Sequence, residues 1–174
     1  ANCYSAGTRE EYLGQALKKN VARDKVVIAS KVYFNEGRLS KAAIEREIDG
    51  SLKRLGTDYL DLYIIHRFDF DTPIEETMGA LADIVRQGKA LYVGISNYDA
   101  DQTRKALAVL KEHKVPCLIH QARYSMFDRW TEPDLLPVLK EEGVGMIAFS
   151  PLAQGLLTDK YLRGIPENSR AAKS

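Results

Sequence analysis

The sequence predicts an α/β protein built as a (β/α)8 barrel. Three observations support this fold class: five short apolar runs rich in β-branched or aromatic residues, a helical pattern or loop after each run, and a spacing of about 30 residues. Such runs are typical of buried parallel strands. The runs and the polar residues that follow them are Val26–Ser30 before Lys31, Leu60–Ile65 before His66, Leu91–Ile95 before Ser96 and Asn97, Cys117–His120 before Gln121, and Met146–Phe149 before Ser150.

Capping patterns mark two of the helices that alternate with these strands. Thr8 and Thr72 each stand three residues before a glutamate, Glu11 and Glu75, which predicts a capping box at each helix start. The first of these helices is expected to turn its apolar positions toward the core. Those positions are Tyr12, Leu13, Ala16 and Leu17.

Single residues mark the ends of the other helices. Ser40 is expected to cap a helix that ends at Gly56, where a left-handed residue is favoured. Asp99 is expected to cap a helix that runs to about His113, and a shorter helix is expected to end at Gly143.

Two architectures fit alternating strands and helices: an open doubly wound sheet and a barrel. A doubly wound sheet usually has a glycine-rich phosphate loop after its first strand, and the sequence contains no G-x-G-x-x-G. Polar residues follow all five strands instead, at the ends where the chemistry of a barrel takes place. A complete barrel typically needs about 250 residues, so the 174 residues are expected to form a partial barrel.

Composition restricts the classes of function. Apolar residues make up 45% of the chain and charged residues 28%, and the net charge of +1 gives no field that would favour nucleic acid or an anionic membrane. No apolar stretch reaches the roughly 20 residues of a membrane span. Cys3 and Cys117 have no metal-ligand spacing, so we expect free thiols in a reducing cytoplasm and no metal site.

Several motifs follow one another in a characteristic order. They are Ala1–Tyr4 followed by Glu10 and Glu11, Ile28–Lys31, Tyr59–Leu62 leading to His66 and Arg67, Gly88–Lys89 leading to Gly94–Tyr98, His120–Gln121, and Ser150–Tyr161. Together they resemble the aldo-keto reductase family, most closely its branch of potassium-channel β-subunits and bacterial glyceraldehyde-3-phosphate reductases. The resemblance implies a (β/α)8 TIM barrel of which this chain covers roughly strands 2–7. Residues 1–174 would form a single partial domain without the first strand region and the last strand and helix.

The resemblance also implies a catalytic group of Asp, Tyr, Lys and His. Tyr4, Lys31 and His66 match three of these, and the aspartate would fall before Ala1. Carbonyl reduction needs a hydride on carbon and a proton on oxygen. A tyrosine hydroxyl is a weak acid at neutral pH, and a nearby Lys31 ammonium would stabilise its phenolate form. His66 would donate a hydrogen bond to the carbonyl oxygen as negative charge develops there.

NADPH/NADP+ is the cofactor that the resemblance implies. Ser96, Asn97 and Gln121 offer the donors and acceptors that a nicotinamide carboxamide needs, and Phe149 matches an aromatic residue that stacks on the nicotinamide. A loop after the last strand would wrap the pyrophosphate through backbone N–H groups, and basic residues would lie near the phosphates. These loop and basic residues are Ser150, Pro151, Leu152, Ala153, Gln154, Gly155, Lys160 and Arg170.

Other polar and aromatic residues are interpreted as structural. His120 precedes a site residue along a strand and so points to the opposite face. His113 is a favourable cation near the C-terminus of its helix. Trp130 is interpreted as a loop anchor packed on the barrel, and Asp69 and Asp71 as solvated loop charges.

The sequence favours an enzyme over a regulatory protein. The first hypothesis is an NADPH-dependent oxidoreductase that reduces small aldehydes or ketones, such as glyceraldehyde 3-phosphate or methylglyoxal-like compounds, with Tyr4 as general acid and Tyr33 on the substrate wall. The alternative is an NADPH-binding regulatory subunit with vestigial activity. His66 argues against this alternative, because channel β-subunits carry asparagine there. A third hypothesis is a fragment that is inactive alone.

The expected partner is a small carbonyl substrate in the cytoplasm. Nucleic acid, membrane and metal partners are not expected from the charge and composition. A homo-oligomer is compatible with the sequence.

Overall fold

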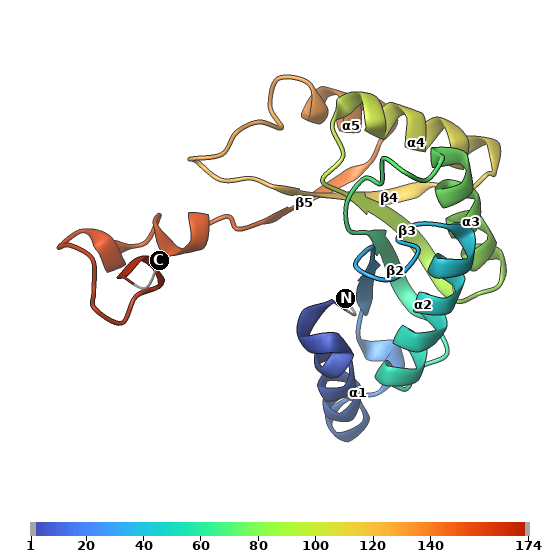
Figure 1. The fold of residues 1–174 in the computed structure, drawn as a ribbon, viewed down its shortest axis with the longest axis horizontal. Helices are drawn as coiled ribbons and strands as arrows, with labels where there is room; N and C mark the ends of the chain where they lie inside the picture. Colours follow the sequence, from blue (N-terminus) through green and yellow to red (C-terminus); the bar gives the residue numbers. More distant parts are fainter. Residues whose placement is uncertain (1–2, 173–174) are drawn as a thin grey trace.

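A parallel sheet of five strands organises the chain (Figure 1). The computed structural model describes residues 3–172. The strands pair in the order of the sequence, and every neighbouring pair is parallel. They are β1 (Ala29–Val32), β2 (Leu60–Ile65), β3 (Ala90–Ser96), β4 (Cys117–Arg123) and β5 (Gly145–Phe149). All five predicted strands are present, although the first begins at Ala29 rather than Val26 and leaves Val27 81% exposed.

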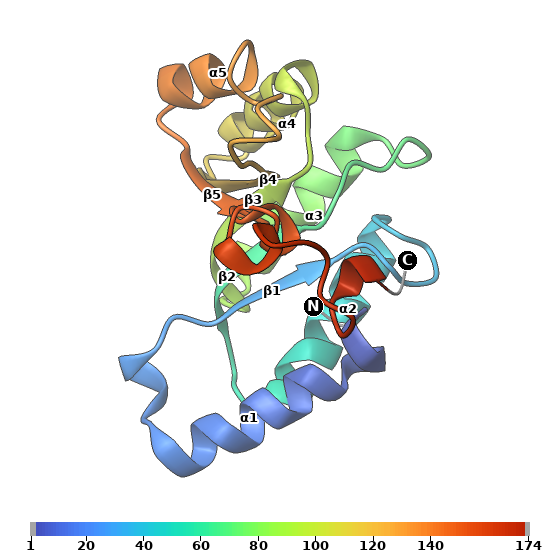
Figure 2. The ribbon, with the colours of Figure 1, turned by 90° about the vertical axis from the view of Figure 1, so that its left-hand side faces the viewer.

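Helices connect the strands, and all but the first lie along one side of the sheet (Figure 1). Figure 2 shows the remaining helix, α1, below β1 and beside α2. No helix in the described part of the chain is both long and apolar enough to cross a membrane. The helices are α1 (Thr8–Asn20), α2 (Lys41–Leu55), α3 (Ile74–Arg86), α4 (Ala100–Glu112) and α5 (Leu135–Glu142).

The strand order decides between the two architectures. In a doubly wound sheet the order reverses at a switch point, whereas β1 to β5 follow one another without a reversal. Parallel strands joined in sequence by helices on one side form an arc of a barrel. The sheet is therefore part of a (β/α)8 barrel, as the sequence predicts.

The two faces of the sheet differ in what covers them. Val32, Tyr63, Ile65 and Ile95 are fully buried in the core between the sheet and the helices. The inner face, which would line the barrel, carries no helix within residues 3–172, and Tyr92 is 46% exposed there. Side chains that end the strands on this inner face are free to meet a ligand.

Single-residue caps are confirmed. The Ser40 side chain accepts a hydrogen bond from the backbone N–H of Ala43 at the start of α2, and Gly56 ends that helix with a φ of 66°. Asp99 caps α4, where it forms a reciprocal capping box with Gln102. These caps succeed because the capping side chain precedes the helix directly and has no competing partner.

The two predicted capping boxes are wrong. The hydroxyl of Thr8 donates to the carbonyl oxygen of Ser5 (2.7 Å), because a short 3-10 turn, η1 (Tyr4–Gly7), precedes α1. The hydroxyl of Thr72 donates to Asp69 (2.7 Å) instead of capping α3. In both cases the threonine hydroxyl donates to an acceptor in the preceding turn or loop instead of capping the helix.

Helix α1 packs through a different face from the predicted one. Tyr12, Leu13 and Ala16 are exposed, so the predicted apolar face is wrong for these three positions. The helix instead approaches α2 at Gly14, where an added Cβ would lie 2.5 Å from the carbonyl oxygen of Leu55. An apolar pattern does not detect this contact, because a glycine and a charged residue form it.

The charged residue in this contact is Glu10, which is 4% exposed. Its carboxylate accepts hydrogen bonds from Ser30 on β1 and, on α2, from Ser51 (3.1 Å) and Arg54 Nε (2.8 Å). Burial alone would raise the pKa of Glu10, but the hydrogen bonds from Ser30 and Arg54 outweigh it, and the pKa lies below its ordinary value. The Glu10 cluster therefore ties α1 to both β1 and α2.

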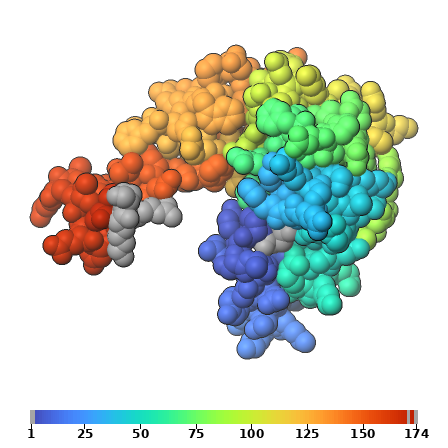
Figure 3. Space-filling model, in the orientation of Figure 1, coloured from blue at the N-terminus to red at the C-terminus, as the bar shows by residue number. Residues whose placement is uncertain are grey.

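The chain leaves the sheet after β5. Residues 150–172 extend away from the rest of the molecule (Figures 1 and 3) and contain short 3-10 turns. Their backbone has positive φ at Ser150, Ala153 and Gln154. The turns are η3 (Ala153–Gly155), η4 (Asp159–Tyr161) and η5 (Arg170–Ala172).

The contact between α1 and α2 predicts opposite effects for two glycine substitutions. Gly14→Ala is expected to lower the free energy of unfolding by about 1–3 kcal/mol, because the new methyl group meets backbone atoms that cannot move aside. Gly79→Ala in α3 is the matched control. Its Cβ would lie 3.6 Å from the nearest atom, and alanine favours a helix over glycine by up to about 1 kcal/mol.

Urea denaturation followed by circular dichroism measures both variants. Equal effects of the two substitutions would contradict the close packing of α1.

Candidate active site

Polar side chains from neighbouring strand ends lie side by side on the inner face of the sheet. Lys31 pairs with Ile64, two residues before His66, and Ser96 pairs with Gln121. Because side chains alternate along a strand, this register directs Lys31 and His66 to the same face. The predicted convergence of strand ends is therefore present in the fold.

Tyr4 and His66 face each other at this edge. Their ring centroids are 6.0 Å apart, and Tyr4 is 43% exposed in the turn η1. Cys3 lies beside them, with its Sγ 4.0 Å from Nδ1 of His66. The charge of Lys31 acts on both Cys3 and His66. The structure thus brings the three predicted catalytic residues into one cluster.

His66 is held on several sides. Its backbone N–H donates to the carbonyl oxygen of Val32 (2.9 Å), and its own carbonyl accepts from Nδ2 of Asn97 (3.0 Å). The ring of Phe34 meets its ring edge-on at a centroid distance of 5.0 Å. Burial, together with the positive charges of Lys31 and Arg67, lowers the pKa of His66 to about 4. The imidazole is therefore neutral at pH 7 and carries one N–H donor.

Lys31 is a half-buried cation at the end of β1. Burial lowers the pKa of Lys31 below its ordinary value. Within residues 3–172, no carboxylate forms an ion pair with its ammonium group. Its positive charge is therefore directed at the cluster rather than neutralised by a neighbour.

The predicted nicotinamide-binding residues lie at the ends of β3, β4 and β5. Ser96 is fully buried, and Oε1 of Gln121 is a buried acceptor with no hydrogen-bond partner among the residues that the structure describes. Asn97 adopts a φ of 57° and donates to the hydroxyl of Ser96 (3.1 Å). Phe149 is half-buried at the end of β5. An unpaired buried acceptor is costly unless a ligand donor reaches it, so the residues present fit a carboxamide.

The loop predicted to wrap a pyrophosphate follows β5 directly. Ser150, Ala153 and Gln154 line a cavity of about 450 Å³ together with Arg123. Gly155 is half-buried, whereas Pro151 and Leu152 are exposed. Because of the positive φ values in this loop, its backbone N–H groups point in directions that a helix or strand does not permit.

The structure does not bring the predicted basic residues to the strand ends. Lys160 lies in the segment that extends from the sheet, where its Nζ is 5.7 Å from the ring centroid of Tyr161. Arg170 is part of η5, and its side chain lies outside the described part of the structure. Their roles therefore stay predictions.

Three residues interpreted as structural have clear partners. Nε2 of His120 lies 3.1 Å from the carbonyl oxygen of Tyr98 in the buried core, which agrees with a structural role. Nε1 of Trp130 donates to the carbonyl oxygen of Arg123 (2.9 Å), as expected of a loop anchor. Burial raises the pKa of the Cys117 thiol to about 12, so this thiol is inert.

One other interpretation needs correction. Asp69 is not solvated: it is 3% exposed and pairs with Arg38 at 3.4 Å. At the end of α4, Nη2 of Arg86 reaches both Nδ1 and the carbonyl oxygen of His113 at 3.2 Å. The guanidinium of Arg86 thus also lies at the C-terminal end of α4, where a positive charge is favourable. The role of His113 as a cation stays a prediction.

Cys3, Phe34 and Arg67 complete the cluster, although the sequence pattern predicts a site role for none of them. Each is the immediate neighbour of a residue that was singled out, namely Tyr4, Tyr33 and His66. Adjacency was the signal that could have identified them.

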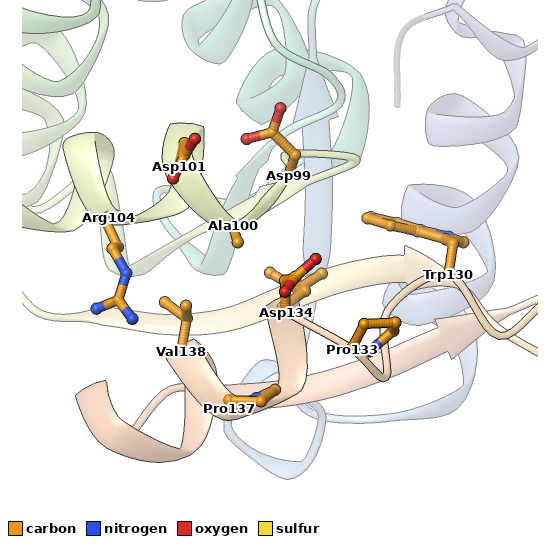
Figure 4. Close-up of a pocket in the computed structure, with 10 residues that line it drawn as sticks. Asp99, Ala100, Asp101, Arg104, Trp130, Pro133, Asp134, Pro137 and Val138 are labelled. Atoms are coloured by element: carbon orange, nitrogen blue, oxygen red, sulfur yellow. The ribbon is translucent and has the colours of Figure 1, made fainter.

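Another cavity lies away from the strand ends. It measures about 550 Å³ between α4 and α5, and Asp99, Arg104, Trp130 and Pro137 are part of its lining (Figure 4). None of the strand-end residues lines it. Reaction chemistry needs titratable groups that face one another, so the strand-end cluster rather than this cavity is the candidate active site.

Comparisons with known proteins agree with this fold and with the strand-end cluster. The family model described as "Aldo/keto reductase family" matches residues 1–174. The chain is 46% identical to an L-glyceraldehyde 3-phosphate reductase of Escherichia coli (strain K12), across 94% of this chain and 50% of that protein. It is 38% identical to a probable voltage-gated potassium channel subunit beta of Oryza sativa subsp. japonica, across 99% of this chain and 55% of that protein.

A solved structure shares the fold. A thermostable aldo-keto reductase in complex with the inhibitor epalrestat superposes with a TM-score of 0.83 at 38% identity, covering 91% of this chain and 56% of that chain. The chain thus belongs to the aldo-keto reductase family. It spans about half the length of the curated relatives described above.

The lowered histidine pKa values predict how stability depends on pH. The pKa of His120 is lowered by burial from 6.5 to about 4. Between these two values the unfolded chain binds a proton that the folded chain does not, so the free energy of unfolding falls as the pH falls. For His120 the full effect is on the order of 3 kcal/mol.

Urea denaturation at several pH values tests this expectation. In His120→Gln, which keeps a donor for Tyr98, the loss of stability between neutral pH and pH 4 should be smaller than in the wild type. An NMR titration of His120 with a midpoint near 6.5 would refute the prediction.

Proposed function

We propose that the complete protein is an NADPH-dependent oxidoreductase that reduces small aldehydes or ketones. The proposal rests mainly on the cluster of Tyr4, Lys31 and His66. This cluster lies at the carboxyl ends of β1 and β2, on the inner face of the sheet. The name of the Escherichia coli relative supports glyceraldehyde 3-phosphate as a candidate substrate, with methylglyoxal-like aldehydes as the uncharged alternative. Residues 1–174 would act as one partial barrel domain in the cytoplasm.

Each residue of the cluster has a separate role in the proposed reduction. A bound nicotinamide cofactor supplies the hydride for the new C–H bond. Tyr4 donates the proton to the carbonyl oxygen, and the Lys31 ammonium stabilises the phenolate that remains. His66, which is neutral at pH 7, donates a hydrogen bond that orients the carbonyl oxygen. The phenol, amine and imidazole thus act on one oxygen atom.

The cofactor is proposed to lie across the ends of β3 to β5. Ser96, Asn97 and Gln121 would hold the carboxamide of the nicotinamide, and Phe149 would stack on its ring. The loop Ser150–Gly155 would cover the pyrophosphate with backbone N–H groups. Lys160 and Arg170 are proposed to reach the phosphates of NADPH, which requires the segment that contains them to approach the barrel.

The channel-subunit relative supports a second candidate function, namely a regulatory protein that binds NADPH and turns over slowly. His66 argues against this candidate, because an imidazole N–H beside the carbonyl oxygen has no use in a protein without chemistry. Multiple turnovers of NADPH oxidation with a panel of aldehydes would exclude it. A single slow turnover would support it.

The proton donor is tested by Tyr4→Phe in the complete protein. Loss of a general acid is expected to lower kcat by about 10²–10⁴-fold, while the dissociation constant of NADPH stays the same, because the phenol is proposed to contact the substrate. Tyr12→Phe is the matched control, since Tyr12 is 67% exposed on α1.

NADPH absorbance follows turnover, and NADPH fluorescence follows binding. Unchanged turnover in Tyr4→Phe would remove Tyr4 from the mechanism.

A further inference from the structure

We propose that Arg67 holds the anionic end of the substrate and makes the enzyme selective for aldehydes that carry a phosphate group. This inference rests on the proposed reductase function and decides between its two candidate substrates. Arg67 follows His66 directly and is exposed, so its guanidinium is available at the edge where the carbonyl would react.

An aromatic platform holds the guanidinium beside the site. Its central carbon lies 5.7 Å from the ring centroid of Tyr33 and 5.9 Å from that of Phe34. The two rings pack edge-on at 5.0 Å, and Phe34 in turn meets the ring of His66 at 5.0 Å. Stacking on aromatic faces orients a guanidinium without using its N–H donors. A continuous set of contacts therefore connects the charge to His66.

Arg67 has no counter-ion within residues 3–172, in contrast to most arginines of the chain. Eight other arginines form ion pairs with a carboxylate: Arg23, Arg38, Arg46, Arg54, Arg86, Arg104, Arg123 and Arg129. An unpaired guanidinium offers a planar fork of donors that matches phosphate oxygens. The N–H donors of Arg67 are therefore available to an anionic ligand.

A cavity opens beside this charge. It measures about 490 Å³ and is lined by Arg67, Tyr33, Asn97 and Trp130 among others. Asn97 also bonds to the carbonyl oxygen of His66, which links the cavity to the catalytic cluster. Pockets of this volume hold small metabolites.

Asp99 is the one carboxylate in this lining. It accepts the backbone N–H of Gln102 at 2.7 Å and caps α4, so the N-terminus of that helix offsets its charge. Its presence does not cancel the attraction between Arg67 and a phosphate.

Substrate selectivity provides the first test. In the wild type, kcat/KM should be higher for glyceraldehyde 3-phosphate than for glyceraldehyde. Arg67→Met should lower kcat/KM for the phosphorylated aldehyde by about tenfold or more, mainly through KM, and leave kcat/KM for glyceraldehyde nearly unchanged. Arg67→Lys should recover part of the loss. Equal losses for both aldehydes, or none, would overturn the proposal.

Arg104→Met is the matched control. Arg104 lines the neighbouring cavity of Figure 4, which also contains Trp130 and Asp99, but it is paired with Glu141 at 3.0 Å. Its replacement should leave the ratio of the two kcat/KM values unchanged. A change as large as that of Arg67→Met would mean that general positive charge, rather than Arg67, sets the selectivity.

Binding provides a second test that does not depend on turnover. Trp130 is the only tryptophan of this chain and lines the same cavity as Arg67, so its fluorescence should respond to occupancy. sn-Glycerol 3-phosphate should change this fluorescence saturably, whereas glycerol should not, and Arg67→Met should weaken the response about tenfold. No saturable response in the wild type would overturn the proposal for Arg67.

The dissociation constant of NADPH separates this role from a cofactor role. It should be the same in Arg67→Met and the wild type. Weaker NADPH binding would assign Arg67 to the cofactor and overturn the inference. If no aldehyde is reduced but the fluorescence response depends on Arg67, the reductase function fails while the phosphate site stands.

Discussion

The buried carboxylate of Glu10 is the constraint on which the arrangement of the active site depends. It joins α1 to β1 through Ser30 and to α2 through Arg54. Tyr4 lies in the turn that leads into α1, and Lys31 follows Ser30 directly on β1. The Glu10 cluster therefore determines where the Tyr4 phenol lies relative to the Lys31 amine, although the cluster contains neither residue.

A charged contact in this position specifies a geometry more than it adds stability. Buried ion pairs often contribute little relative to apolar packing, but a broken one is costly. Gly14 strengthens the constraint, because α1 lies too close to the backbone of Arg54 and Leu55 for even a methyl group. The lowered pKa of Glu10 means that its contribution is present above pH 4.5 and is lost as the pH falls through the lowered value.

The sequence predicts the strands and the residues at their ends well, because β-branched runs and polar strand ends are local features of the chain. It predicts contacts between loops poorly. The hydroxyls of Thr8 and Thr72 find acceptors in the preceding turn or loop, which a capping pattern does not reveal. The stacking of Arg67 on Tyr33 and Phe34 likewise depends on how two loops meet at the sheet edge. Only the fold brings such residues together.

The charges around His66 explain why tyrosine, rather than histidine, is the proton donor in the proposed reaction. Lys31 and Arg67 are both cations, and together with burial they lower the pKa of His66 to about 4. At pH 7 the imidazole has already lost its acidic proton, so it donates a hydrogen bond but does not act as the acid. The same two cations favour the negative charge that develops on the carbonyl oxygen. In the proposed reaction, this arrangement of charge therefore leaves the proton transfer to Tyr4, keeps His66 neutral and would attract an anionic substrate.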